Sequence, residues 1–126
     1  MTEEVKRYLQ KAQRSLRVAD ELLAKGYFDD SCSKSYYVMF YAAQALLRNS
    51  CVDVIKHSAV VAKFGECFVK TGKIDPLFHR YIIDAKQKRE IADYDVFLGI
   101  DRKTSEERFE WARDFLSKIK ELLKNT

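Results

Sequence analysis

One apolar stretch decides the fold of this chain: Tyr36-Tyr37-Val38-Met39-Phe40-Tyr41-Ala42-Ala43-Gln44-Ala45-Leu46-Leu47. Its length indicates a helix, and only Gln44 interrupts its apolar character. A helix that is apolar on all sides must be covered on all sides. One stripe of this helix consists of Phe28, Cys32, Tyr36, Met39, Phe40, Ala43 and Leu47, and the largely opposite face consists of Tyr37, Val38, Tyr41 and Ala45.

The second of these faces predicts how the chain assembles. In a domain this small, a second apolar face is expected to meet another copy of the chain. We therefore predict a symmetric homodimer through the face formed by Tyr37, Val38, Tyr41 and Ala45. The alternative is a central core helix within a monomer.

Two helices are predicted in the first half of the chain. Apolar residues recur at three-to-four spacing over residues 3–25, with Thr2 as a plausible N-cap and Gly26 just past the end. The apolar helix itself starts near Asp29 or Asp30, because carboxylates favour helix N-termini. It is expected to run to about residue 48.

Two more helices follow the apolar one. A shorter helix is predicted over about 58–71, and Gly72 ends it. Asp75 and Pro76 then open a fourth helix as N-cap and first-turn proline, and this helix continues to about residue 92.

The last helix completes an all-α domain of about five helices. Residues 93–103 are predicted to form a structured loop, and Thr104 with Glu107 fits a capping box at the start of the final helix. The chain has only 4 Gly and 1 Pro, which favours long helices over a loop-rich or all-β design. We predict a single domain over residues 1–126.

Composition narrows the class of protein. The chain has 126 residues, of which 47% are hydrophobic and 33% charged, as in an ordinary globular protein. No apolar run is long enough for a membrane span, and the charged N-terminus does not resemble a signal peptide. The three cysteines form no CxxC pair, which favours reduced thiols and a cytoplasmic location. The net charge of +4 permits an anionic partner without requiring one.

One charged residue conflicts with the pattern of the fourth helix. Phe78, Tyr81, Ile82 and Ala85 define its apolar stripe, and Arg89 falls in the middle of that stripe. A buried guanidinium must pair, reach water, or face a cleft that binds an anion. Asp93, four residues later, offers a purely structural partner. Lys86 and Lys88 lie beside this arginine and could steer phosphates toward it, although solvated charges explain such a pair equally well.

The remaining polar residues give weaker signals. Glu90, Asp93 and Asp95 surround Tyr94, but one short acidic segment without a second set of ligands does not predict a metal site. His57 precedes the third helix and either is an ordinary surface residue or reaches the Arg89 cleft. His79 is predicted to have a surface role. The sequence contains no cofactor signature such as GxGxxG or a P-loop, so no cofactor is predicted.

The chain resembles the small stand-alone prokaryotic HEPN proteins over nearly its whole length. The resemblance rests on five segments in order: Lys11-Ala12-Gln13-Arg14-Ser15-Leu16, residues 35–47, Lys56-His57-Ser58, residues 68–73 and Arg89-Glu90-Ile91-Ala92-Asp93-Tyr94. It implies an antiparallel helical bundle that pairs into a homodimer with a cleft near the interface. It also implies a minimal nucleotidyltransferase as partner in a toxin–antitoxin pair.

Many HEPN proteins are metal-independent ribonucleases that use an arginine followed four to six residues later by a histidine. Here Arg89 matches the arginine, but Tyr94 stands where the histidine is expected. An unperturbed phenol is poorly suited to proton transfer at neutral pH. The resemblance therefore favours a protein that binds nucleotide or RNA phosphate without cleaving it. The predicted binding site consists of Arg89, Asp93, Tyr94, His57 and Lys86.

The sequence leaves two alternatives to phosphate binding open. One is a ribonuclease with Arg89 and Tyr94 as its catalytic residues. The other is a non-catalytic dimeric scaffold, in which the Arg89–Asp93 pair is structural and the dimer surface is the function.

Overall fold

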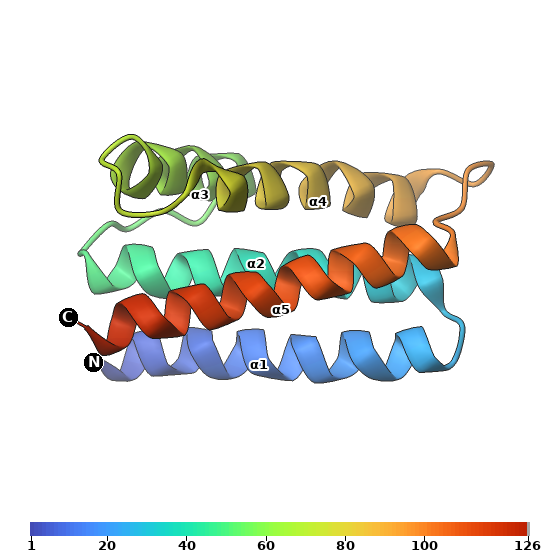
Figure 1. Cartoon of the computed structure of the whole chain (residues 1–126), viewed down its shortest axis with the longest axis horizontal. Coiled ribbons are helices and arrows are strands. Elements are labelled where there is room, and N and C mark those ends of the chain that lie inside the picture. Colours follow the sequence, from blue (N-terminus) through green and yellow to red (C-terminus); the bar gives the residue numbers. More distant parts are fainter. Residues whose placement is uncertain (126) are drawn as a thin grey trace.

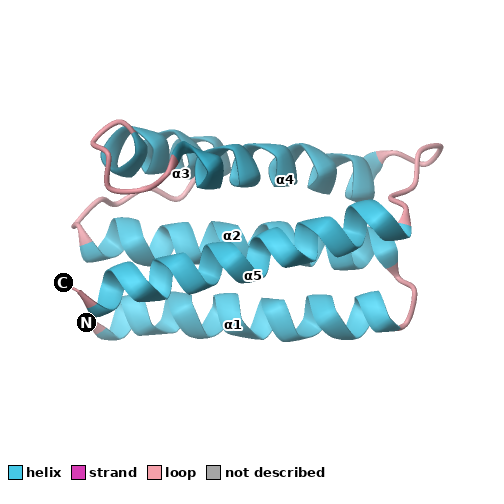
Figure 2. Ribbon diagram, in the orientation of Figure 1, coloured by secondary structure: helices cyan, strands magenta, loops and turns pink. Residues whose placement is uncertain are grey.

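The computed structural model describes residues 1–125, and these residues contain helices but no strand. The helices lie side by side, and successive long helices run in opposite directions, so both termini lie at the same end of the bundle (Figure 1). Short loops join them (Figure 2). The helices are α1 (Glu3–Ala24), α2 (Phe28–Asn49), α3 (His57–Phe64), the π-helical turn η1 (Gly65–Val69), α4 (Pro76–Tyr94) and α5 (Arg102–Lys124). The predicted all-α bundle is confirmed.

Several helix ends follow the predicted capping residues. Thr2 Oγ1 accepts a hydrogen bond from Val5 N at 3.2 Å at the start of α1. Asp75 Oδ1 accepts from Leu77 N at 2.8 Å, with Pro76 as the first residue of α4. Gly26 has φ +84°, a left-handed conformation that glycine adopts without a steric cost.

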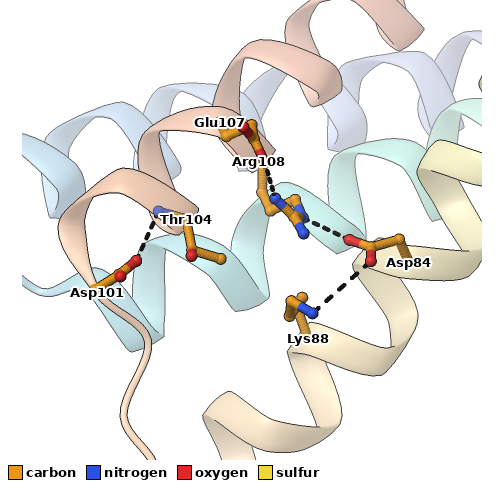
Figure 3. A network of polar contacts seen from close by, with 6 residues as sticks. All are labelled: Asp84, Lys88, Asp101, Thr104, Glu107 and Arg108. Atoms are coloured by element: carbon orange, nitrogen blue, oxygen red, sulfur yellow. Dashed lines mark hydrogen bonds and ion pairs between the residues drawn. The ribbon is translucent and has the colours of Figure 1, made fainter.

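The start of α5 differs from the prediction. This helix begins at Arg102, and Asp101 Oδ1 accepts a hydrogen bond from Thr104 N at 2.8 Å (Figure 3). The predicted capping box of Thr104 and Glu107 is therefore wrong. An aspartate is a strong N-cap, and this one lies three residues earlier, so the helix gains most of another turn before Thr104.

The segment predicted as one helix over 58–71 changes its winding in the middle. The regular helix α3 ends at Phe64, and η1 continues it. Gly65 sits where the chain passes His79, because a Cβ at Gly65 would lie 2.5 Å from the Cε1 of that imidazole. The predicted surface role of His79 is corrected: its ring is half-buried, and Nε2–H donates to Val61 O at 3.0 Å.

Helix α2 is the centre of the molecule. It packs against α1, α3, α4 and α5, and these helices cover it around its circumference. Val38 and Ala45 are both 0% exposed within the single chain, so they cannot form the predicted dimer face. The structure instead shows the alternative, a central core helix, and only Tyr37 and Tyr41 of that face are half-buried. A homodimer stays a prediction and would need another surface.

A buried ion pair joins α4 to α5 and fixes the position of α4. Arg108 is only 6% exposed, and its Nε donates to Asp84 Oδ2 at 2.6 Å (Figure 3). Its guanidinium also lies 4.1 Å from the ring centroid of Trp111, which stacks on Tyr81 of α4 at 4.5 Å. This arginine was not predicted from the sequence, although it lies four residues before Ala112 on the apolar stripe of α5.

No helix among residues 1–125 is long and apolar enough to cross a membrane.

Removing Arg108 tests how much its ion pair with Asp84 contributes to stability. We expect Arg108→Ala to lower the free energy of unfolding by about 3 kcal/mol, because Asp84 then keeps only its 3.8 Å ion pair with Lys88 and the contact with Trp111 is lost. Arg7→Ala is the matched control, since Arg7 and Glu3 are 76% and 72% exposed, and a loss below about 1 kcal/mol is expected there. Urea denaturation measures both values. Equal losses would contradict a buried structural pair.

Candidate functional site

The site is centred on Arg89, which lies one turn after Ala85 on the inner face of α4. Ile82 and Ala85 are buried in the core, and the Arg89 side chain is 14% exposed, as its place on the apolar stripe predicts. Its guanidinium carbon lies 5.3 Å from the ring centroid of Tyr36 and 5.7 Å from that of Tyr37. Two aromatic rings of α2 therefore stabilise the charge by cation–π contact where water is largely excluded.

The hydrogen-bonding capacity of Arg89 is only partly used. Its Nη1 lies 3.6 Å from Asp93 Oδ2, which is an ion pair but too long for a hydrogen bond. Its Nε is buried and has no hydrogen-bond partner among residues 1–125. A charged donor without an acceptor is costly, so the Asp93 pair alone does not account for this arrangement.

His57 lies beside this arginine, although they are far apart in the sequence. As the first residue of α3, it stacks on Phe40 with ring centroids 4.1 Å apart, and its Nδ1 lies 2.6 Å from the hydroxyl oxygen of Tyr36. Tyr37 contacts its ring edge-on, at 5.9 Å between centroids. Tyr36 and Tyr37 thus each contact both His57 and Arg89. The interpretation of His57 as a residue near the Arg89 site agrees with this geometry.

The protonation states of this cluster follow from burial and charge. Burial raises the pKa of the Tyr36 phenol far above its ordinary value, so the hydroxyl keeps its proton. Burial, followed by the positive charges of Arg89 and Lys86, lowers the pKa of His57 below 6.5. A protonated phenol and a neutral imidazole allow two arrangements of this bond: the Tyr36 hydroxyl donates to Nδ1, or Nδ1–H donates to the Tyr36 hydroxyl oxygen. In the first arrangement the imidazole proton is on Nε2, and in the second Nε2 is free to accept a proton.

Lys86 is close to the cluster but is engaged in another interaction. Its Nζ lies 3.0 Å from Glu90 Oε1, one turn further along α4. The hydrogen bond from Lys86, followed by its charge, lowers the pKa of Glu90. Lys86 contributes positive potential near His57 while its ammonium binds a carboxylate.

Tyr94 does not join Arg89. Five residues along a helix correspond to a rotation of about 140°. The Tyr94 side chain is 75% exposed and lines a shallow surface hollow with Ile91 and Phe97 rather than the arginine cluster. The nearby acidic residues also diverge. Asp95 caps the backbone N–H groups of Phe97 and Leu98 at 2.8 and 2.9 Å, which lowers its pKa.

No three His, Cys, Asp or Glu residues converge within residues 1–125 as ligands of a metal ion would.

Comparison with known proteins agrees with this architecture. The model of the HEPN domain family matches residues 5–123. The chain belongs to the HEPN domain family. A relative from Methanocaldococcus jannaschii, named "Putative toxin", is 33% identical to this HEPN domain over 95% of the chain and 82% of the relative. A second "Putative toxin" from the same organism is 32% identical, over 97% of the chain and 90% of the relative. A "UPF0332 protein" of Gloeobacter violaceus is 36% identical over 75% of each.

The rings around Arg89 are the part of the site that sequence reasoning missed. Tyr36 and Phe40 were assigned to the core and Tyr37 to a dimer face, yet these three rings hold the guanidinium and the imidazole together. In this HEPN domain, the Arg89 guanidinium and the neutral His57 imidazole therefore contact the same group of aromatic rings. The guanidinium keeps a buried N–H donor that has no acceptor among the described residues. Such an arrangement can bind a phosphate oxygen and can also exchange a proton near it.

The pKa of His57 tests the geometry of this cluster. In a two-dimensional NMR titration, we expect His57 to titrate below pH 6.5 and Arg89→Gln to raise that pKa, because the variant removes a positive charge. The unfolded chain takes up this proton at a higher pH than the folded chain does. Acidification below about pH 6.5 therefore lowers the free energy of unfolding.

Arg80→Gln is the matched control, since it removes an exposed arginine from the same helix. Equal pKa values of His57 in wild type and Arg89→Gln would contradict the contact.

Proposed function

We propose that this HEPN domain is a toxin–antitoxin-related protein that binds a nucleotide or RNA phosphate at Arg89. The observation that carries the proposal is the buried Nε of Arg89, which has no acceptor among the described residues. A phosphate oxygen would accept from this donor, and arginine is well suited to bind phosphate through several N–H groups. The Arg89 side chain is 14% exposed, so part of it is accessible from solvent.

The association with a toxin–antitoxin system is supported by the names of two relatives from M. jannaschii. Such a role requires a protein partner, and a minimal nucleotidyltransferase remains the proposed one. A partner surface is available at the α4–α5 connection, where Val96, Phe97 and Leu98 are 86%, 93% and 62% exposed. Contiguous exposed apolar side chains are typical of protein contacts. The proposed homodimer would need a surface of this kind, because Val38 and Ala45 are buried.

Ribonuclease activity is a second candidate, and the position of His57 favours it. Arg89 would hold the scissile phosphate. His57 would accept the proton of the attacking 2′-hydroxyl at Nε2, in the tautomer whose Nδ1–H donates to the Tyr36 hydroxyl oxygen. Tyr94 is a poorer candidate for this step than the sequence indicated, since it lies on another side of α4. In the scaffold alternative, Arg89 would only support the fold through Asp93.

Binding of a short labelled single-stranded RNA to Arg89→Gln distinguishes these functions. We expect a loss of about tenfold to a hundredfold relative to wild type, because a charge-assisted hydrogen bond to phosphate is removed. Arg80→Gln, which removes an exposed arginine of the same helix, should bind like wild type. Fluorescence anisotropy measures the affinities, and thermal unfolding shows that each variant is folded.

The same samples on a denaturing gel test cleavage. Products that disappear in His57→Asn and Arg89→Gln would establish the ribonuclease. Unchanged RNA affinity in a destabilised Arg89→Gln would contradict the phosphate site and favour the scaffold.

A further inference from the structure

A basic groove runs between α1 and α2 and includes Tyr37 in its lining. Its volume is about 730 Å³, and its charged lining consists of Arg7, Lys11, Arg14 and Lys34. The remaining walls include Tyr37 and Tyr41, and no carboxylate belongs to the lining. Four cations without an acid in one hollow create a positive potential that attracts anions.

The spacing of these residues makes the groove a continuous track. Arg7, Lys11 and Arg14 follow one another at four and three positions, so they share one face of α1. From the first to the last of them the helix rises about 10 Å, which allows contact with more than one phosphate of a chain. On α2, across the groove, the lining residues are spaced by three and then four positions: Lys34, Tyr37 and Tyr41.

The cations of the groove lie against its aromatic wall. Lys11 Nζ is 4.9 Å from the centroid of the Tyr41 ring, and Lys34 Nζ is 5.9 Å from that of Tyr37. Within residues 1–125, neither these lysines nor Arg14 has a carboxylate within ion-pair distance, whereas Arg7 forms a largely exposed pair with Glu3. That pair spans 3.5 Å and contributes little. Most of this charge is therefore available to a ligand.

Tyr37 connects the groove to the arginine site. Tyr37 belongs to the groove lining, and its ring centroid lies 5.7 Å from the Arg89 guanidinium carbon and 5.9 Å from the centroid of the His57 ring. A ligand that fills the groove would thus contact a residue that also contacts Arg89. The two positive regions are adjacent parts of one surface.

We propose that this groove binds the backbone of single-stranded RNA and leads it toward Arg89. The second part of this proposal, the delivery of a phosphate to Arg89, rests on the proposed function. Unpaired cations along a groove and tyrosine rings between them are the features with which proteins bind single strands, since the charges contact phosphates and the rings contact bases. An acidic peptide would use the charges but leave the rings without a role.

The test compares a groove variant with a matched surface variant. Lys11→Gln, Arg14→Gln and Lys34→Gln together remove three charges from the groove. Lys70→Gln, Arg80→Gln and Lys103→Gln remove the same charges from exposed positions outside it. The probes are a labelled 12-mer of single-stranded RNA and AMP, measured over a range of salt concentrations with thermal unfolding as a check of the fold.

We expect the groove variant to reduce the salt dependence of binding to the 12-mer. The slope of log affinity against log salt should fall by about 2, because each phosphate contact with a single strand contributes about 0.7. AMP is too short to follow the groove, so its affinity should stay within about twofold of wild type. Arg89→Gln should weaken both probes.

Three results would overturn the proposal: equal slopes in the two triple variants, equal affinity of wild type for a polyglutamate peptide of matched charge, or no binding of the 12-mer by wild type. The groove and Arg89 can fail separately. If only Arg89→Gln weakens binding, the groove is overturned and the phosphate site stands. If only the groove variant weakens binding, the RNA track is supported and the role of Arg89 is overturned.

Discussion

Helix α2 is apolar around its whole circumference, and the need to cover it places every other helix. Burial of its side chains is the main favourable contribution to the fold, at roughly 25 cal/mol for each Å² of apolar surface removed from water. Helix α1 covers one side, and α4 and α5 cover others. Both candidate regions are consequences of that packing: the groove forms where α1 meets α2, and the arginine cluster forms where α3 and α4 meet the same helix.

The burial of Arg89 is costly in the absence of a ligand, and the fold offsets this cost only in part. Two tyrosine rings and a 3.6 Å ion pair stabilise the guanidinium, but Nε keeps no acceptor among the described residues. Arg108 shows the contrast on α5, because a 2.6 Å hydrogen bond to Asp84 and the face of Trp111 satisfy a guanidinium that is buried even more deeply. Arg89 and Arg108 thus differ in how completely the chain satisfies them, and Arg89, the less satisfied of the two, adjoins the histidine.

The sequence predicted local features well and relations between helices less well. Helical periodicity and the caps Thr2 and Asp75 predicted most helix ends, and the stripe of α4 predicted the burial of Arg89. The stripe of α5 places Arg108 four residues before Ala112 and indicates its burial in the same way. Whether Val38 is covered by the same chain or by a second copy depends on the neighbouring helices, which periodicity within one helix does not reveal. For the same reason, neither the approach of His57 to Arg89 nor the groove could be predicted from the spacing within any one helix.

The Nε–H resonance of Arg89 gives the most direct test that this buried donor is a phosphate site. In a 1H–15N spectrum, the loss of one side-chain signal in Arg89→Gln would assign it, and AMP would then be titrated into the wild-type protein. The account predicts that this resonance shifts progressively and saturates with AMP, while the Nε–H signals of Arg80 and Arg102 stay in place. A stationary Arg89 signal, with AMP binding evident elsewhere in the spectrum, would contradict it.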